Sequence, residues 1–254
     1  MERASAQPPP AGGTPSAGCT PPAARPRPAS AAVPSDRVRL RRRRERGSHD
    51  RAVIDAIIDE ALIAHVGFVD GDGQPFVIPT LHARCGDQVY VHGSAAGRTL
   101  AIVSDERPIC LTVSLIDGLV LARSAMHHSA QYRSVVLLGK ARSVDARAEK
   151  RAAFEAIVEH VVPGRWPDVR PPSDNELRAT SVAALSIEEA SAKLRTGPPV
   201  DDEEDYALRT WAGVIPLALR AGAPEPDPRL RAGIEPPHYA RAYARPRSAG
   251  GARS

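Results

Sequence analysis

The sequence predicts a mainly β protein with flanking helices, an α+β chain organised around an antiparallel barrel. Short apolar stretches rich in Val, Ile and Leu follow one another with Gly-containing turns between them, a pattern typical of antiparallel strands. Two longer stretches, 50–64 and 146–162, instead repeat their apolar residues at helical spacing. Because strands and helices do not alternate regularly, a doubly wound parallel sheet is disfavoured.

The composition restricts the class of protein. The chain has 254 residues, enough for a sizeable core, but only 4% are aromatic, so that core must consist mainly of aliphatic side chains. The sequence contains no apolar run long enough to cross a membrane and no apolar leader, so neither a membrane span nor a secretory signal is expected. Cys19, Cys85 and Cys110 have no metal-ligand spacing, so we expect neither a disulfide framework nor a structural metal, and a cytoplasmic location.

The chain divides into three parts by composition. Residues 1–46 are predicted to be a disordered tail rich in Pro, Ala and Arg, residues 47–220 the folded domain, and residues 221–254 an irregular Pro- and Arg-rich tail. The basic run 37–46 could contact nucleic acid, but no aromatic side chains interleave to stack on bases, so that partner is disfavoured. We interpret the run as a solvated linker, with room for one or two arginines to fold back on a ligand.

The first half of the domain predicts one helix and then short strands. Ser48 or Asp50 can cap the helix over 50–64. The strands predicted after it are 65–69, 74–83 and 88–92, with turns at 70–73 and 85–87. Pro79 inside the second strand indicates an edge position or a place where the ladder opens towards a ligand.

A glycine-rich corner follows the third of these strands. His92-Gly-Ser-Ala-Ala-Gly-Arg98 leads into a helix predicted over 99–104. Backbone N–H groups at a helix N-terminus bind anions, and the guanidinium of Arg98 can add charge-assisted hydrogen bonds. The corner is therefore either a phosphate site or an ordinary strand-to-helix connection.

The centre of the domain carries the densest set of polar candidates. Strands are predicted at Leu111–Ile116, Leu119–Ala122 and Val135–Leu138, and Asp117-Gly118 is typical of a tight hairpin turn between the first two. A polar loop over 124–134 joins the last two strands and holds two histidines, hydroxyl groups and Arg133. Rigid strands position such loop side chains well, so we expect function to concentrate in this loop.

Two further groups of residues could hold a metal, and both are disfavoured. Adjacent histidines such as His127 and His128 tend to point in different directions, and no third ligand occurs at a supportive spacing. The acidic run 201–205 matches no calcium loop and is interpreted as solvated surface. The rest of the chain predicts a loop at 166–175, a strand at 179–187 that runs on through 191–195, and a last strand at 211–219.

Three segments in this order resemble a known family. Phe76-Val-Ile-Pro-Thr80, then 89–98, then 127–139 are similar to the pyridoxamine 5'-phosphate oxidase-like flavin-binding proteins, in particular the branch with nitroimidazole-resistance proteins. The resemblance covers 46–219. It implies a split β-barrel that binds FMN, a homodimer with the flavin at the subunit interface, and oxidoreductase activity on an unknown small molecule. Alternatives are a non-catalytic flavin-binding or stress-sensing protein, and deazaflavin or haem in place of FMN.

The resemblance also implies which residues contact the cofactor. The positions it assigns are Val77, Ile78, Pro79 and Thr80 beside the isoalloxazine ring, His92, Ser94 and Arg98 around the phosphate, and His128, Ser129, Tyr132, Arg133 and Ser134 on a second strand. No catalytic residue is identified, because in a flavin protein the cofactor carries the redox chemistry. The Trp-Gln-Gly segment and late Arg-x-His with which the oxidases of vitamin B6 hold their substrate have no counterpart, so that reaction is not expected.

Overall fold

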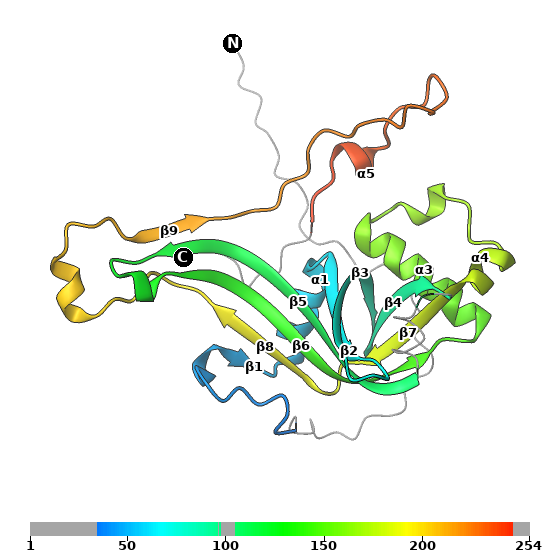
Figure 1. The fold of residues 1–254 in the computed structure, drawn as a ribbon. Helices are drawn as coiled ribbons and strands as arrows, with labels where there is room; N and C mark the ends of the chain where they lie inside the picture. Colours follow the sequence, from blue (N-terminus) through cyan, green and yellow to red (C-terminus); the bar gives the residue numbers. More distant parts are fainter. Residues whose placement is uncertain (1–34, 96, 98–104, 246–254) are drawn as a thin grey trace, which may run out of the picture.

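One antiparallel sheet organises the molecule (Figure 1). The computed structural model describes residues 35–95, 97 and 105–245. The strands in this part of the chain are β1 (Gly47–Ser48), β2 (Ile63–Val69), β3 (Pro75–Cys85), β4 (Gln88–Ser94), β5 (Asp105–Leu121), β6 (Ser129–Ser143), β7 (Thr180–Ser186), β8 (Ala190–Arg195) and β9 (Gly213–Pro216). Their order is β1-β8-β6-β7-β4-β3-β2-β5-β9, and β6 also pairs with β5. That extra pairing closes the segment from β6 to β5 into a barrel, so the predicted antiparallel barrel is confirmed.

Helices flank this barrel. The helical elements are α1 (Arg51–Glu60), α3 (Arg147–Val161), α4 (Asp174–Ala179), α5 (His238–Arg241) and the 3-10 turns η1 (Arg44–Arg46), η2 (Ala125–His127), η3 (Trp166–Asp168) and η4 (Glu203–Ala207). Asp50 caps α1 by accepting a hydrogen bond from the backbone N–H of Ala52, as the sequence predicted. In the described residues no helix is long and apolar enough to cross a membrane.

The core is aliphatic and lies inside the barrel. Ile54, Ile57 and Ile58 of α1 are buried, and they belong to the same cluster as Leu111 of β5 and Leu137 of β6. Helix α3 packs instead against β3, and it also contacts Tyr90 of β4, in a second cluster separate from the barrel core. The barrel therefore gains its stability from branched side chains, as expected for a chain with so few aromatic residues.

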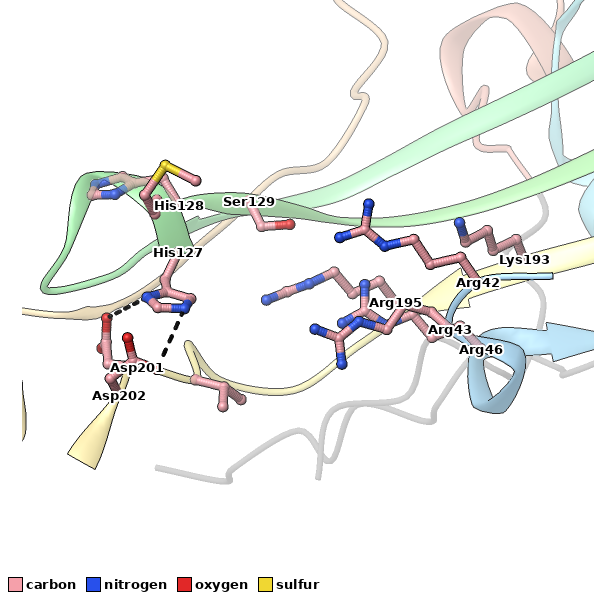
Figure 2. A pocket seen from close by; sticks show the side chains of 12 residues that line it. Arg42, Arg43, Arg46, His127, His128, Ser129, Lys193, Arg195, Asp201 and Asp202 are labelled. Carbon is pink, nitrogen blue, oxygen red and sulfur yellow. Dashed lines mark ion pairs between the residues drawn. The ribbon is translucent and has the colours of Figure 1, made fainter. Parts of the chain in front are cut away.

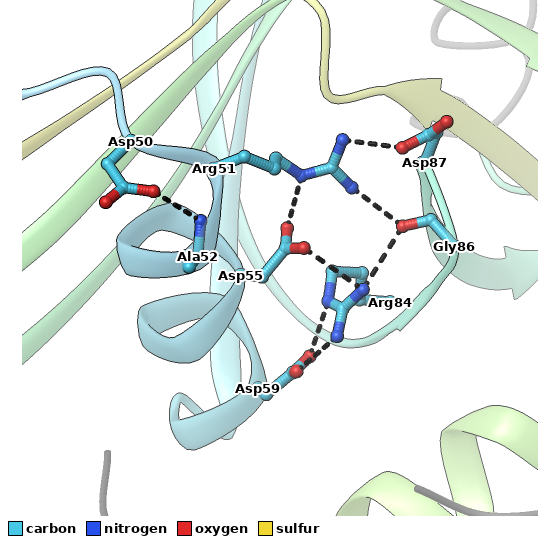
Figure 3. A network of polar contacts seen from close by, with 8 residues as sticks. All are labelled: Asp50, Arg51, Ala52, Asp55, Asp59, Arg84, Gly86 and Asp87. Carbon is cyan, nitrogen blue, oxygen red and sulfur yellow. Dashed lines mark hydrogen bonds and ion pairs between the residues drawn. The ribbon is translucent and has the colours of Figure 1, made fainter. Parts of the chain in front are cut away.

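Ion pairs fix α1 to the turn between β3 and β4 (Figure 3). Arg51 donates hydrogen bonds to Asp55 one turn along the helix and to Asp87 in the turn. Arg84 of β3 donates to Asp59, with 2.9 Å between its Nε and the carboxylate. These partly buried pairs hold the helix in one register against the sheet.

The predicted hairpin at Asp117-Gly118 is wrong. Strand β5 runs unbroken through both residues, and its register with β6 shifts there, because Ile116 faces Tyr132 and Gly118 faces Gln131. Asp117 is thus the extra residue of a β-bulge, a feature that tolerates the same small and polar residues as a turn. The hairpin turns later, through η2, so that residues from Ser129 onward lie in strand β6 and not in a loop.

Other local differences from the sequence-based expectation are smaller. The strand predicted over 179–195 is two strands, β7 and β8, separated at 187–189. The loop predicted over 166–175 contains the start of α4, which Ser173 and Glu176 begin with a capping box. The helix predicted over 99–104 and the tail before residue 35 lie outside the described residues.

The cysteines also differ from expectation. Cys85, at the buried end of β3, is disulfide-bonded, whereas Cys110 is free. The sequence predicted no disulfide framework, and it did not predict this single bond at Cys85, because spacing along a sequence does not reveal which chain segments meet.

Pro79 lies where the ladder of β3 is one-sided. Its segment, 75–81, pairs with β2, and Pro79 itself faces His65. Strand β4 pairs only with the later residues 82–85. Proline removes a backbone donor, and among the described residues the ladder to β4 does not reach Pro79, which agrees with one of the two predicted arrangements. That the ladder opens towards a ligand stays a prediction.

Candidate functional site

A pocket of about 530 Å³ lies between η1, β8 and the tip of the β5–β6 hairpin (Figure 2). Cationic side chains form one wall, and acidic and imidazole groups form the other. The lining residues are Arg42, Arg43, Arg46, Met126, His127, His128, Ser129, Lys193, Arg195, Val200, Asp201 and Asp202. We call the part formed by Arg42, Arg43, Arg46, Lys193 and Arg195 the cationic pocket.

Arg195 is the buried member of the cationic pocket. Only 7% of it is exposed, and its Nη1 has no hydrogen-bond partner among the described residues. Burial, and then the neighbouring charge of Arg46, lower the pKa of Arg195. A buried donor without a partner is costly, and a charged one more so, hence this site is arranged to receive an anion.

The sheet places these cations together. Lys193 and Arg195 are two residues apart on β8, so both side chains leave the same face of the strand. Gly47 of β1 pairs with Lys193, which brings the preceding turn η1 and its arginines beside β8. The site therefore joins residues about 150 positions apart in the chain. Whether these arginines contact a ligand, as the sequence allowed for one or two of them, stays a prediction.

Arg43 has a strained backbone at the edge of this pocket. Its φ of 56° and ψ of 54° are left-handed, and it is the one non-glycine residue with positive φ in the part of the chain that the structure describes. A side chain in this conformation costs about 1–2 kcal/mol. Such strain persists where the surrounding structure requires it, and it occurs often at binding sites.

Asp201 anchors the opposite wall. Its inaccessible carboxylate accepts hydrogen bonds from the backbone N–H groups of Arg123 and Ser124, at 2.9 and 3.3 Å, and from Nη1 of Arg123 at 3.1 Å. Removal from water raises its pKa, but these hydrogen bonds outweigh that effect and lower it. The interpretation of 201–205 as solvated surface is therefore wrong for Asp201, which pins this segment to the hairpin tip.

His127 belongs to the acidic wall (Figure 2). Its Nδ1 is 2.6 Å from the hydroxyl of Ser124 and 4.0 Å from a carboxylate oxygen of Asp201. Its Nε2 is 4.0 Å from a carboxylate oxygen of Asp202. Ligand atoms of His127, Asp201 and Asp205 lie within 4.8 Å of one another. Both oxygens of Asp201 already accept hydrogen bonds from Arg123, so a cation there would compete with a guanidinium.

Several predicted cofactor residues share one face of the sheet with the cationic pocket. Tyr132 of β6 faces Arg195 of β8, and Ser134 faces Lys193. A single row of paired residues then crosses five strands on that face: Pro79, His65, Thr112, Val136 and Ser191. Val77, two residues before Pro79 and 66% exposed, adds an apolar surface to the same face.

Arg133 points to the other face of β6. Its guanidinium donates hydrogen bonds to Glu60 at the end of α1 and to Asp117 in the bulge of β5. These hydrogen bonds raise its pKa further above the usual value. Sequence reasoning selected Arg133 as an anion ligand, but its carboxylate partners were not recognisable from local spacing. Its contact with a cofactor stays a prediction.

The glycine-rich corner lies on a different part of the sheet. Ser94 of β4 faces Thr180 of β7, and β4 also pairs with β3. Arg133 lies where β6 pairs with β5 and β8, nine residues before the point at which β6 meets β7. The two predicted halves of the phosphate site thus belong to different strand pairs. Arg98 lies outside the described residues.

The remaining predicted residues fall into three environments. The buried Nδ1 of His92 has no partner in the described chain, its ring lies 5.6 Å from that of Phe154, and burial lowers its pKa. His128 is exposed, with Nδ1 2.9 Å from the carbonyl oxygen of Ser124, and Ser129 lines the pocket. Ile78 packs against the core, whereas the hydroxyl of Thr80 donates to the carbonyl oxygen of Leu81.

Comparisons with known proteins agree with this fold. The family model described as pyridoxamine 5'-phosphate oxidase matches residues 50–194. The flavocytochrome Anf3 from Azotobacter vinelandii is 47% identical, with 82% of this chain and 96% of that chain covered and a TM-score of 0.77. The FAD- and haem-binding protein from Mycobacterium smegmatis is 35% identical, with 77% and 96% covered and a TM-score of 0.73. No curated protein matches the chain.

Proposed function

The chain belongs to the pyridoxamine 5'-phosphate oxidase family, and on that premise we propose that it is an oxidoreductase that holds a flavin and a haem. Its fold is that of the flavin-binding split-barrel proteins. The likeness to a flavocytochrome carries the proposal, because nearly half of the aligned residues are identical and almost all of that protein is covered. A flavin beside a haem supplies one-electron and two-electron chemistry in one protein.

The outer face of the barrel fits the flavin ring. Val77 and Pro79 present an apolar strip beside the one-sided ladder of β3, where backbone groups are not all committed to a neighbouring strand. A flat aromatic ring covers such a strip and is oriented by backbone hydrogen bonds. We propose that residues 77–80 hold the ring, and that Tyr132 and Ser134 bound the same face.

The cofactor that we propose is FAD, with FMN as the alternative. The sequence resemblance implied FMN, but the Mycobacterium smegmatis protein similar to this chain is described as binding FAD. The two flavins share the ring, so the strip at Val77 does not distinguish them. Analysis of the released cofactor distinguishes both from a deazaflavin.

Two histidines fit the requirements of a haem ligand. His128 and His49 are both exposed. The Nδ1 of His128 lies within hydrogen-bond distance of the backbone carbonyl oxygen of Ser124, and the Nδ1 of His49 lies within that distance of the carbonyl oxygen of Ala190. A carbonyl only accepts, so Nδ1 carries the proton and Nε2 keeps the lone pair that binds iron. We favour His128, because the apolar side chain of Met126, two residues earlier in the chain, is 89% exposed and offers a surface to a porphyrin.

We also propose that the protein is a homodimer. The arm formed by β5, β6 and β9 carries large exposed apolar side chains: Ile116, Leu119, Trp211, Ile215 and Leu217. Contiguous apolar surface of this kind marks an interface in most proteins. The expected measurement is a particle of twice the chain mass in light scattering. The cytoplasmic location expected from the sequence stays a prediction.

The spectrum of the purified protein tests the proposed function. Expression with added haem precursor should give flavin and haem absorption bands together, and acid treatment should release FAD. His128→Gln should remove the haem bands and leave the flavin bands, with His49→Gln as the matched control. Protein that is colourless and does not quench the fluorescence of added FAD or FMN would contradict the proposal.

A further inference from the structure

We propose that the cationic pocket binds the phosphoanhydride group of a nucleotide, with Arg195 as its central donor. This inference rests on the proposed function only for the identity of the nucleotide. The flavin itself is one source of this group if it is FAD, and a separate nucleotide that exchanges electrons with the flavin is the other.

The positive charge of the pocket favours a ligand that carries more than one negative charge. Three arginines of the basic run and two cations of β8 line it. Glu45 lies 4.0 Å from Arg43, and Asp201 is committed to Arg123, so the carboxylates near the pocket do not balance its five positive charges. A phosphoanhydride carries several charges and many acceptor oxygens. It therefore satisfies several guanidinium donors at once, which a single carboxylate cannot do.

The buried guanidinium is the second observation that points to a ligand. Arg195 is more than nine-tenths buried and lines the pocket, and its Nη1 is inaccessible to solvent and has no hydrogen-bond partner among the described residues. Most buried polar atoms in folded proteins have a partner. An oxygen of the ligand would supply the missing acceptor and would offset the repulsion between Arg195 and Arg46.

The volume of the pocket and the residues at its two ends favour a nucleotide over a free phosphate. At about 530 Å³ it is within the range of sites for small organic molecules. Asp202, at the end remote from the cations, offers an exposed carboxylate to ribose hydroxyl groups, and Ser129, between that end and the arginines, offers a hydroxyl. One end of the pocket thus suits phosphates, and the other suits a sugar.

The pocket lies far along the sheet from the residues that we propose to hold the flavin ring. Four strand spacings separate β3, with Pro79, from β8, which is about 19 Å along the sheet. A phosphate held at Arg195 is therefore remote from a ring held at residues 77–80. In FAD the phosphoanhydride begins at the same ribityl phosphate that FMN carries, so in both flavins the length of one ribityl chain limits its distance from the ring. The separation therefore favours a second, separate nucleotide, and FAD would reach the pocket only with its ring nearer to β6 than residues 77–80 are.

Arg195→Gln tests the proposal, because glutamine keeps the polar stem and removes the charge. Dissociation constants of FAD and FMN are measured by fluorescence quenching, and ADP is titrated by calorimetry into the protein as purified. A loss of FAD affinity of about tenfold to a hundredfold, larger than any loss of FMN affinity, assigns the pocket to the flavin. The same loss for ADP, with both flavins unchanged, assigns it to a separate nucleotide. No change in any of the three overturns the proposal.

A second variant guards against a folding defect. Arg43→Gly removes a charge and also relieves the left-handed strain, so it should weaken binding while the melting temperature stays equal or rises. The matched control is Arg170→Gln, an exposed arginine paired with Glu176 next to α4, which should leave binding unchanged. Equal losses in these two variants would show a general charge effect and would overturn the proposal.

The proposed function and this inference fail separately. A protein that carries no flavin but binds ADP through Arg195 would contradict the proposed function and support the pocket. A flavin-loaded protein whose affinities for FAD, FMN and ADP are unchanged by Arg195→Gln and Arg43→Gly would support the proposed function and contradict the assignment of the pocket.

Discussion

The carboxylate of Asp117 accepts two hydrogen bonds from Arg133, one from Nε at 2.8 Å and one from Nη2 at 2.7 Å. The bulge in β5 places Asp117 for this contact by leaving it out of the ladder with β6. Glu60 at the end of α1 binds the same guanidinium. One arginine therefore connects the helix, the bulge and β6, and it fixes the base of the long β5–β6 hairpin that carries one wall of the pocket.

We expect Asp117→Asn to destabilise the fold by about 1–2 kcal/mol. The change leaves Arg133 with one carboxylate partner, and a lost charged hydrogen bond costs about 1.5–3 kcal/mol, reduced here because Asp117 is one-third exposed. Urea unfolding followed by circular dichroism measures the difference. Asp36→Asn, in an exposed pair with Arg39, is the control and should change stability by less than about 0.5 kcal/mol. Equal effects of the two substitutions would contradict the assignment.

The Asp117 bulge also shows where sequence reasoning stops. Local periodicity located α1, because Ile54, Ile57 and Ile58 recur at helical spacing and all three are buried, but it extended the helix to residue 64, whereas α1 ends at Glu60 and β2 begins at Ile63. Asp-Gly, in contrast, suits a hairpin turn and a bulge equally well. The choice between them depends on Arg133, sixteen residues later, and on the pairing of β5 with β6.

The candidate site was only partly predictable for the same reason. The basic run was visible in the sequence, and its folding back onto a ligand position was among the expectations. Lys193 and Arg195 looked like ordinary alternation in a strand, because nothing near them indicates that Gly47 pairs with Lys193. Long-range strand pairing, and not a motif, makes the cationic pocket.

We expect Arg245→Ala to loosen the end of α1. The guanidinium of Arg245 donates hydrogen bonds to the backbone carbonyl oxygens of Asp59, Glu60 and Ala61, groups that have no partner within the helix. A cation at a helix C-terminus also interacts favourably with the helix dipole. The loss should be about 1–2 kcal/mol in chemical denaturation. Arg241→Ala, four residues earlier and exposed, should have no measurable effect, and equal losses would contradict this role.

The free energy of unfolding should decrease as the pH is lowered from about 6.5 to about 4. His82 is fully buried, and burial, followed by the charge of the neighbouring His160, lowers its pKa to about 4. The unfolded chain takes up a proton near pH 6.5, whereas the folded chain does so only near pH 4. Above pH 6.5 His82 is neutral in both states, so it does not change the free energy of unfolding. As the pH falls below 6.5, its protonation in the unfolded chain lowers the free energy of unfolding by at most about 3 kcal/mol.

His82→Gln should flatten that pH dependence, because glutamine does not titrate. The comparison requires urea midpoints for both proteins at several pH values between 4 and 7, with the difference in unfolding free energy plotted against pH. His238→Gln, at the exposed start of α5, serves as the control and should keep the slope of the unchanged protein. If the His82→Gln protein keeps the same slope, buried His82 is not the source.

The contact between Asp201 and the hairpin tip should hold the segment over 199–208 in place. Asp201→Ala removes the acceptor of three hydrogen bonds and leaves the backbone N–H groups of Arg123 and Ser124 without their carboxylate. Amide hydrogen exchange in that segment should therefore become about tenfold faster, because local opening no longer breaks these bonds. Asp202→Ala, whose side chain is 73% exposed, should leave the exchange rate unchanged. Equal rates in the two variants would show that the segment is held by its other contacts, such as that of Tyr206 with the guanidinium of Arg123.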